Sequence, residues 1–353
     1  MSYLEEANKR LAELKDKDEV VILAIESSCD ETACAILRNR EVLSNIIASQ
    51  IEIHKRFGGV VPEVASRNHT LAIKNVVDEA LTKAGMTFKD IDAIAVTYGA
   101  GLLGALLVGV SYAKALAYAL NLPLIAVNHI KGHIAVNYVA CPELKPPYIC
   151  LIASGGHTAI AHVKNYLDME IIGETQDDAC GEAFDKVARA LGLPYPGGPD
   201  VEKLAKEGKP VIEMPIPFKN QDTFNFSYSG LKTAVINYIH TKEQKGESYS
   251  REDIACSFQE RATGMMVANA VRACECYGLD TIVIGGGVGA NGCLRAKMQE
   301  ECEKRGFKAV YPPIGLCTDN AVMIASQAYN MIRSGVEASD IDLEASATVE
   351  VVD

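Results

Sequence analysis

The segment VILAIESSCDETACAIL, residues 21–37, decides the fold, because its pattern returns in YICLIASGGHTAIAHV, residues 148–163. In each segment an apolar run is followed by a short polar or glycine-rich turn and a second apolar run. This pattern predicts two strands joined by a hairpin. Its recurrence indicates that the chain contains an approximate internal duplication.

The elements that follow each hairpin repeat as well. After the first hairpin we predict strand 42–50, helix 62–84, strand 91–98, helix 102–120 and strand 123–127. After the second we predict strand 169–173, helices within 180–207, helix 251–277, strand 281–286, helix 291–305, strand 308–312 and helix 319–334. Strands followed by alternating helices and strands, twice over, predict an α/β protein of two duplicated domains. We expect a ligand cleft between the domains, with both hairpin turns facing it.

The length of 353 residues also favours two domains of roughly 150 residues each. We predict an N-terminal extension over 1–18, a first domain over 19–145 and a second over 146–324, with a loop and helix insertion near 208–250. The C-terminal helix, about 325–347, is a candidate addition to the first domain. The apolar run 102–120 contains Lys114 and several small residues, which favours a buried helix over a membrane span.

Charge and cysteine usage limit the function. The net charge of −12 argues against a protein that holds nucleic acid by bulk electrostatics, so a nucleic-acid partner would need local basic patches or another subunit. Eleven cysteines with no Cys-x-x-Cys pair are typical of reduced thiols and predict a cytoplasmic protein. Residues 1–18 lack the apolar core of a secretory signal, and we expect no membrane partner.

Two histidines and a distant carboxylate suggest a metal site. Asn128 is a good cap for a helix that would carry His129 and His133 on one face, four residues apart. Asp319 also lies between an apolar run and a helix, so the three side chains would form a two-histidine, one-carboxylate site if these ends meet. The alternative is a pair of ordinary core histidines. A zinc protease is disfavoured because no glutamate follows His129.

Other polar groups concentrate in turns. The glycine-rich turns 154–158 and 285–291 expose backbone N–H groups that suit phosphate, although such turns also occur without a ligand. In the first hairpin Asp30 and Glu31 either solvate the turn or take part in proton transfer. Asp185 lies on a helix and could face the ligand or the solvent.

Ten ordered blocks between Val21 and Arg333 resemble the TsaD family, the tRNA N6-adenosine threonylcarbamoyltransferases, formerly called O-sialoglycoprotein endopeptidases or glycoproteases. The blocks are IESSCDETACAI, GGVVPEVASRNH, TYGAGLLGALLVG, NHIKGHI, SGGHTAI, GEAFDKVARALGLPYPGGP, FSYSGLKTA, SFQERA, GGGVGANGCLR and CTDNAVMIA. The resemblance implies an actin-like ATPase fold, shared with sugar kinases and Hsp70 proteins. It also implies an acyltransferase that moves a threonylcarbamoyl group from threonylcarbamoyl-adenylate to N6 of the adenosine 3′-adjacent to the anticodon, in tRNAs reading ANN codons.

The resemblance assigns roles to particular residues. It implies that His129, His133 and Asp319 bind one divalent ion, Fe(2+) or Zn(2+). It implies that an adenylate or ATP-type nucleotide contacts the following residues: Ile152, Ala153, Ser154, Gly155, Gly156, Asp185, Gly198, Glu202 and Asn291. Asp30 or Glu31 is the candidate proton acceptor. The implied partners are tRNA, threonylcarbamoyl-adenylate, a TsaB-like paralogous subunit and a TsaE-like ATPase.

Three features depart from the family pattern. The chain has an extension before Glu19, Lys131 stands where relatives often have an acid, and Glu202 stands where many relatives have an aspartate. Rival functions on the same fold are a kinase, a chaperone-like ATPase and a non-catalytic scaffold. The former protease assignment is the least favoured.

Overall fold

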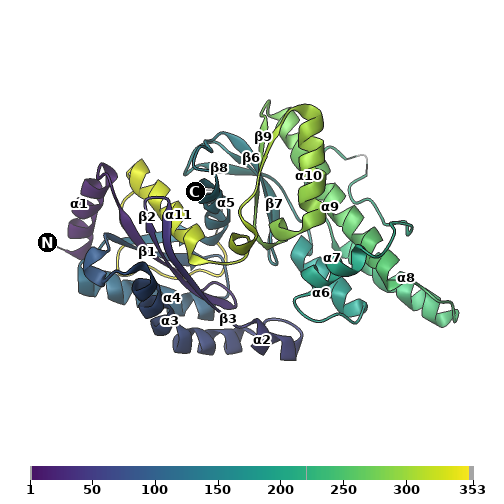
Figure 1. Cartoon of the computed structure of the whole chain (residues 1–353), viewed down its shortest axis with the longest axis horizontal. Helices are drawn as coiled ribbons and strands as arrows, with labels where there is room; N and C mark the ends of the chain where they lie inside the picture. Colours follow the sequence, from purple (N-terminus) through teal and green to yellow (C-terminus); the bar gives the residue numbers. More distant parts are fainter. Residues whose placement is uncertain (1, 220, 350–353) are drawn as a thin grey trace. The chain divides into compact units, whose positions relative to one another are not determined.

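The computed structural model describes residues 2–219 and 221–349, so Met1 of the predicted extension lies outside it. The chain folds into two compact units (Figure 1). Of the described residues, the first unit consists of 2–146, 165–168 and 318–349. The second consists of residues 147–164, 169–219 and 221–317.

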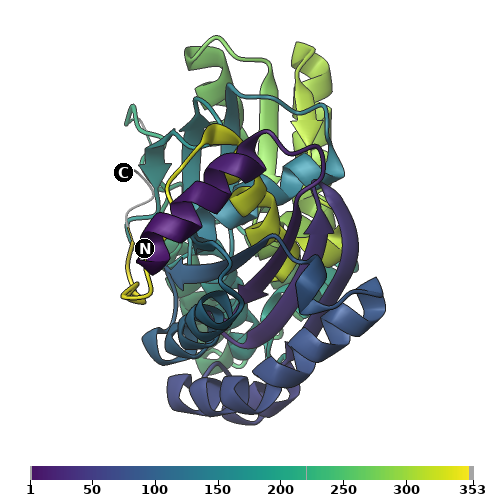
Figure 2. The ribbon, with the colours of Figure 1, turned by 90° about the vertical axis from the view of Figure 1, so that its left-hand side faces the viewer.

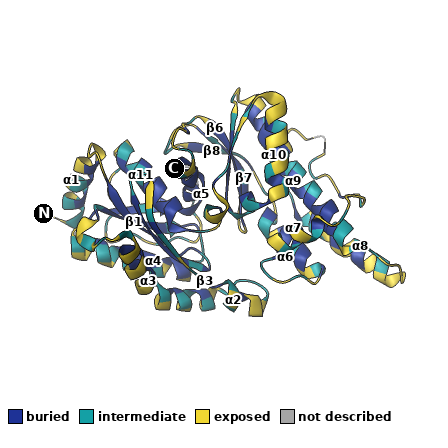
Figure 3. Ribbon diagram, in the orientation of Figure 1, coloured by how far each residue is buried: buried dark blue, intermediate teal, exposed yellow. Residues whose placement is uncertain are grey.

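The first unit is built on a five-stranded sheet in the order β3–β2–β1–β4–β5. Its strands are β1 (Val21–Glu26), β2 (Glu31–Arg38), β3 (Glu41–Ser49), β4 (Ala93–Gly99) and β5 (Leu124–Asn128). β2 pairs antiparallel with β1 and β3, whereas β4 pairs parallel with β1 and β5. Every residue of β1 is buried (Figure 3), as expected for a central strand that is covered on both faces.

Helices cover this sheet. The main ones are α3 (Pro62–Ala84), α4 (Leu103–Leu120), α5 (His129–Ala140) and α11 (Ala321–Ser334). Short helical turns α2 (Ile51–His54), η1 (Lys55–Phe57) and η2 (Phe88–Asp90) join the longer elements. α3 packs beside α4, and α5 packs beside α11, which also contacts β1 and β2. The sequence determines where α3 begins and ends, because Pro62 stands in its first turn and Gly85 ends it in the left-handed conformation.

The second unit repeats the same topology. Its sheet has the order β10–β9–β6–β7–β8, with β6 (Tyr148–Ala153), β7 (Thr158–Val163), β8 (Met169–Glu174), β9 (Thr281–Gly285) and β10 (Lys308–Val310). β6, β7 and β8 correspond to β1, β2 and β3, with the same antiparallel pairing, and β9 lies parallel to β6 and β10. The predicted duplication is therefore confirmed by the order and direction of the strands.

The helices of the second unit are α6 (Cys180–Ala190), α7 (Gly197–Ala205), α8 (Ser229–Gln244), α9 (Arg251–Cys276) and α10 (Gly292–Arg305). The turns η3 (Gly287–Ala290) and η4 (Ile314–Leu316) complete it. The described residues of the predicted insertion near 208–250 contain one helix, α8, between irregular segments. The predicted strand 308–312 ends early, at Val310, and prolines 312 and 313, which have no N–H group, follow it.

Helix α4 is the one helix of the described residues that is long and apolar enough to cross a membrane. A third of it is buried, so the helix that was predicted to be buried is buried on one side only. Ala105, Gly109 and Ala113 lie on its buried side, whereas Leu103 and Leu107 are about half exposed. A single helix of this kind is weak evidence for a membrane span, since core helices of globular domains have the same composition.

The N-terminal extension forms helix α1 (Tyr3–Lys15), which begins with a reciprocal capping box between Ser2 and Glu5. α1 packs against α11 (Figure 2) and buries Leu11 and Leu14. Arg333 at the end of α11 donates a hydrogen bond of 2.7 Å to the carbonyl of Lys15. The extension is therefore an integral part of the first unit.

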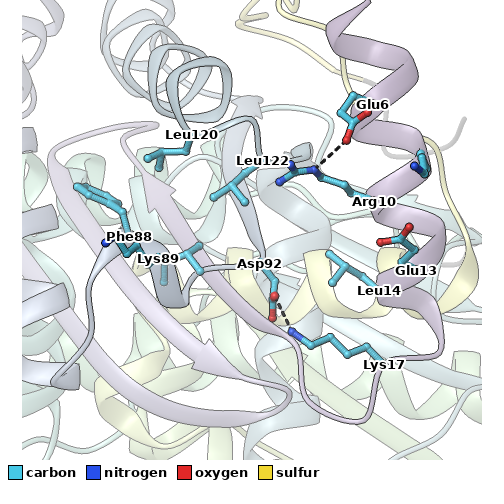
Figure 4. Close-up of a pocket in the computed structure, with 12 residues that line it drawn as sticks. Glu6, Arg10, Glu13, Leu14, Lys17, Phe88, Lys89, Asp92, Leu120 and Leu122 are labelled. Carbon is cyan, nitrogen blue, oxygen red and sulfur yellow. Dashed lines mark hydrogen bonds and ion pairs between the residues drawn. The ribbon is translucent and has the colours of Figure 1, made fainter. Parts of the chain in front are cut away.

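A cavity of about 700 Å³ lies along α1, between this helix and residues 88, 89, 91, 92, 120 and 122 (Figure 4). Its lining mixes both signs of charge, with ion pairs between Arg10 and Glu6 and between Lys17 and Asp92. None of the residues that the sequence suggested for a ligand or metal lines it.

We expect the substitution Leu11→Ala to lower the free energy of unfolding by about 2–4 kcal/mol, because the side chain is only 3% exposed and its removal leaves a cavity between α1 and α11. Chemical denaturation monitored by circular dichroism measures this change. Glu13→Ala is the matched control, since Glu13 is exposed on the same helix, and it should change stability by less than about 0.5 kcal/mol. Equal effects of the two substitutions would contradict the docking of α1.

Candidate metal centre and ligand-binding turns

The local sequence builds the histidine pair as predicted. β5 ends at Asn128, whose side chain accepts hydrogen bonds from the backbone N–H groups of Ile130 and Lys131 and so caps α5. His129 and His133 therefore stand one helical turn apart in the first turns of α5. Their rings meet edge to face, with centroids 4.7 Å apart.

The close packing of α5 and α11 brings the carboxylate to these histidines. Gly132 lies so near α11 that a Cβ atom there would be 3.0 Å from Ile324 Cδ1. The Ser326 hydroxyl donates a hydrogen bond of 2.6 Å to the carbonyl of Ala135. Asn320 caps α11 through the N–H of Met323, which places Asp319 just before the helix begins.

The three side chains form a cluster that is compatible with a metal site. One ligand atom from each of His129, His133 and Asp319 lies within 4.8 Å of the others. Asp319 Oδ1 is 3.1 Å from His133 Nε2 and 3.6 Å from His129 Nε2. Both histidines are buried, and the aspartate side chain is about one-fifth exposed, so the cluster remains accessible to an ion from one side.

The hydrogen bonding of His133 also fits a metal ligand. Among the described residues neither ring nitrogen of this fully buried histidine has a hydrogen-bond partner. Its contact with Asp319 therefore lacks hydrogen-bond geometry. A buried imidazole usually satisfies at least one nitrogen, and an ion held by His129, His133 and Asp319 would account for Nε2, the nitrogen that lies near Asp319.

Negative charge accumulates around the cluster. Burial and the neighbouring carboxylates of Asp30 and Asp319 raise the pKa of Glu31 to about 9. Burial opposes protonation of His129, but Asp319 and Glu26 outweigh it and raise the pKa of His129 to about 9. Both shifts report an excess of negative potential at this end of the first unit, which favours a bound cation.

Sequence reasoning did not assign a role to several polar residues beside the cluster. Glu26 is fully buried at the end of β1 and faces His129 Nδ1 at 3.1 Å. His69 on α3 contacts the Thr32 hydroxyl through Nδ1 at 2.7 Å and the carbonyl of Cys29 through Nε2 at 2.9 Å. It thereby holds the turn that carries Asp30 and Glu31. The sequence did contain an indication of a role for Glu26, because this residue ends a predicted strand and precedes a turn with two further acidic residues.

The nucleotide-contact residues named in the sequence analysis all belong to the second unit, where backbone contacts connect them. Ile152 and Ala153 are the buried last residues of β6, and Ser154, Gly155 and Gly156 form the turn to β7. The N–H of Gly181, in the first turn of α6, donates to the carbonyl of Ser154. Gly286 after β9 has φ of +92° and lies directly against the carbonyl of Ala153, so only glycine fits there.

The other residues that the sequence analysis named as nucleotide contacts lie at the N-termini of helices in this unit or accept hydrogen bonds from them. Asp185 accepts a hydrogen bond of 2.7 Å from the N–H of Gly197, at the beginning of α7 beside Gly198. Glu202 accepts one of 3.2 Å from the N–H of Gly292, at the beginning of α10. Asn291 caps α10 and donates to Gln259. Burial raises the pKa of Asp185, although the N–H groups of Gly197 and Gly198 act in the opposite direction.

Comparison with known proteins identifies the family. Residues 41–326 match the sequence profile of TsaD, described as tRNA N6-adenosine threonylcarbamoyltransferase. A protein of that name from Clostridium botulinum (strain 657 / Type Ba4) is 56% identical over 315 residues, which are 89% of this chain and 93% of the relative. One from Clostridium perfringens (strain ATCC 13124) is 55% identical over 95% of this chain and 99% of its own length. The chain belongs to the TsaD family.

Solved structures of other proteins have a similar fold, although their sequence identity to this chain is low. HypF from T. kodakarensis aligns with a TM-score of 0.64 at 15% identity, over 92% of this chain. Full-length HypF in a phosphate- and nucleotide-bound form aligns with a TM-score of 0.61 at 16% identity. The chain spans about half the length of these HypF chains. (R)-2-hydroxyglutaryl-CoA dehydratase component A aligns over its full length with a TM-score of 0.51. These structural similarities agree with the predicted actin-like α/β fold.

The close approach of α5 and α11 can be tested with Gly132→Val. The added side chain would collide with Ile324 and Met323, so the two helices must separate, and we expect the melting temperature to fall by several degrees. Differential scanning calorimetry measures the change. Ala140→Val places the same residue at an exposed position of α5 and is the matched control. A melting temperature no lower for Gly132→Val than for Ala140→Val would refute the close packing.

The dependence of stability on pH tests a pair of salt bridges in the second unit. Asp178, just before α6, pairs with Lys186 at 2.8 Å and with Lys232 of α8 at 2.7 Å. Burial alone would raise the pKa of Asp178, but the hydrogen bonds from Lys186 and Lys232 lower it. A lowered pKa stabilises the fold above the unfolded-state value near 3.9, and this contribution disappears as the pH falls.

We therefore expect Asp178→Asn to reduce the free energy of unfolding by about 1 kcal/mol at pH 7. The difference in the free energy of unfolding between wild type and variant should become smaller below about pH 4. Urea unfolding at several pH values measures it. A difference that stays constant from pH 7 to pH 3 would show that the carboxylate charge is not responsible.

Proposed function

We propose that this chain transfers the threonylcarbamoyl group of threonylcarbamoyl-adenylate to N6 of the adenosine 3′-adjacent to the anticodon, in tRNAs that read ANN codons. Membership of the TsaD family is the observation that carries the proposal. The cluster of His129, His133 and Asp319 supports it, because two imidazoles and one carboxylate leave coordination positions open for a substrate.

In this proposal the cluster holds one divalent ion, Fe(2+) or Zn(2+). The ion would supply Lewis-acid stabilisation of negative charge on phosphate or carbamoyl oxygens. His129 and His133 would present Nε2, and Asp319 would present the carboxylate that lies nearest to solvent. The donor set does not discriminate between the two metals, since both accept nitrogen and carboxylate ligands.

The adenylate is proposed to bind at the connected turns of the second unit. Gly155 and Gly156 are exposed, and a Cβ atom at either position would meet nothing within 4 Å. Their backbone is therefore open to a ligand, and the N-termini of α7 and α10 at Gly198 and Asn291 offer a favourable field for phosphate. Asp185 and Glu202 would act mainly by holding these N-termini in place.

When the N6 amine of adenosine attacks the acyl carbon, the bond from that carbon to the phosphate oxygen breaks, AMP leaves, and the amine loses a proton. Burial and the charges of Asp30 and Asp319 raise the pKa of Glu31 to about 9. A cation bound at Asp319 would offset the charge of that carboxylate and lower the pKa of Glu31 again. We therefore propose that Asp30 or Glu31 accepts the proton.

Binding of tRNA by so acidic a chain calls for partners. Lys297 pairs with Glu260, and Arg305 pairs with Glu275 and Glu301, so much of the basic surface is already neutralised. We propose that a TsaB-like subunit and a TsaE-like ATPase share the task, in the cytoplasm. The exposed leucines of the adjacent helices α3 and α4 would provide a docking surface: Leu71, Leu103 and Leu107.

The rival functions explain fewer observations. A kinase or chaperone-like ATPase would use the same fold but would not require the histidine pair. A metalloprotease would require a general base beside the ion, and Ile130 follows His129 where that glutamate would stand.

Reconstitution tests the proposed reaction. The full chain is combined with a threonylcarbamoyl-adenylate synthase, both partner proteins and unmodified tRNA, and the nucleosides are analysed by mass spectrometry. We expect threonylcarbamoyladenosine to form. We expect His129→Ala and Asp319→Ala to lower the rate at least a hundredfold, because each removes one of only three protein ligands. The exposed Glu13→Ala variant should keep the wild-type rate.

Two results would contradict the proposal. The first is a complete mixture that yields no modified adenosine. The second is unchanged transfer by His129→Ala, which would separate the activity from the metal centre.

A further inference from the structure

The residue that the metal centre leaves unexplained is Glu26, a carboxylate with no exposed surface at the end of β1. Burial of a charged group is unfavourable unless other groups compensate. Within residues 2–219 and 221–349, no lysine or arginine forms an ion pair with Glu26, and its one ion-pair partner is His129. A buried acid of this kind contributes little to stability and more commonly serves a site.

Hydrogen bonds fix the position of the Glu26 carboxylate from two directions. Oε1 accepts from the backbone N–H of Ser28, in the turn after β1. Oε2 accepts a bond of 2.6 Å from the hydroxyl of Thr97 on the neighbouring strand β4. The same Oε2 lies 3.1 Å from Nδ1 of His129. The carboxylate is therefore held by β1 and β4 and directed at the imidazole.

We propose that Glu26 is a positioning residue for the metal centre, which accepts the Nδ1 proton of His129 in a hydrogen bond and so directs Nε2 towards the ion. This inference rests on the metal site of the proposed function. An ionised carboxylate can only accept, so a hydrogen lies on Nδ1, and Nε2 is the nitrogen left to give its lone pair to the ion once its own proton is lost. Nε2 is the nitrogen that faces Asp319, at 3.6 Å. A carboxylate behind a ligating histidine both orients the ring and makes it a better ligand.

The two histidines are held differently. His129 has Glu26 and the hydroxyl of Ser28 within 3.1 Å of Nδ1. His133 has no partner at Nδ1 among the described residues. Glu26 therefore determines which nitrogen binds at only one of the two imidazole ligands.

Glu26→Gln tests this role because it keeps the shape of the side chain and removes its charge. The amide has one oxygen and one NH₂ group, whereas both carboxylate oxygens accept hydrogen bonds here. If the NH₂ group of this amide points towards His129, it donates a hydrogen bond, so Nδ1 of His129 must accept. The imidazole hydrogen then lies on Nε2, the nitrogen that would have to bind the ion. With NH₂ towards Ser28, two donors face each other. Either orientation disturbs the site.

The experiment measures affinity for Zn²⁺ alone by competition with a chromophoric chelator, on the full-length protein. We expect Glu26→Gln to weaken binding 10- to 100-fold. Thr97→Val, which removes the bond that holds Oε2, should weaken it by a smaller factor. Absorption spectra of the Co²⁺-loaded variants should shift, because the orientation of one ligand changes.

Ser27→Ala is the matched control. Ser27 is buried next to Glu26, and its hydroxyl donates to the carbonyl of Ala105 on α4, so the variant also loses a buried hydrogen bond. We expect it to lower the melting temperature while Zn²⁺ affinity stays within twofold of wild type. A merely structural role of Glu26 predicts instead that affinity follows stability in all three variants.

The outcomes separate the two proposals. Folded Glu26→Gln that binds Zn²⁺ as tightly as wild type overturns the positioning role and leaves the metal centre intact. Failure of the wild type to bind Zn²⁺ overturns both. If the Glu26→Gln variant does not fold, the Thr97→Val variant provides the test. A Zn²⁺ affinity equal to that of the wild type in Thr97→Val would then overturn the positioning role.

Discussion

The contact between α5 and α11 is the constraint on which the candidate metal centre depends. Each helix contributes to the cluster at its N-terminal end, and neither would present a complete set of ligands alone. The contact is close because Gly132 has no side chain and because the Ser326 hydroxyl bonds to a backbone carbonyl of α5. Two capped N-termini meet at Asp319, where their dipoles favour a negative group.

The duplication explains where these helices come from. β5 leads into α5 in the first half, and β10 leads towards α11 in the second, so the two junctions occupy equivalent positions in the repeat. The histidines come from one junction and Asp319 from the other. The hairpin turns are equivalent too, but they differ in chemistry. The first carries Asp30 and Glu31, which attract cations, whereas the second carries Gly155 and Gly156, whose N–H groups suit anions.

Local patterns in the sequence were sufficient to predict most of the elements. Apolar periodicity located the strands and helices, and Asn128 marked a helix start that the structure confirms as a side-chain cap. What the sequence could not provide is information that arises only from packing. The burial of Glu26 depends on Thr97, which is on another strand. The role of Asp185 at the start of α7 depends on a turn between two helices, and the docking of α1 depends on Arg333 near the other end of the chain.

The charge balance of the first unit connects these features. Glu26, Asp30, Glu31 and Asp319 lie around two imidazoles, and burial prevents water from screening them fully. The structure accommodates this by a raised pKa at Glu31, caused by burial and the adjacent carboxylates, and by a raised pKa at His129, where Asp319 and Glu26 outweigh burial. Both shifts mean that protons compensate excess negative charge. A divalent cation would provide the same compensation, and it would do so at the one position where Asp319 is open to solvent.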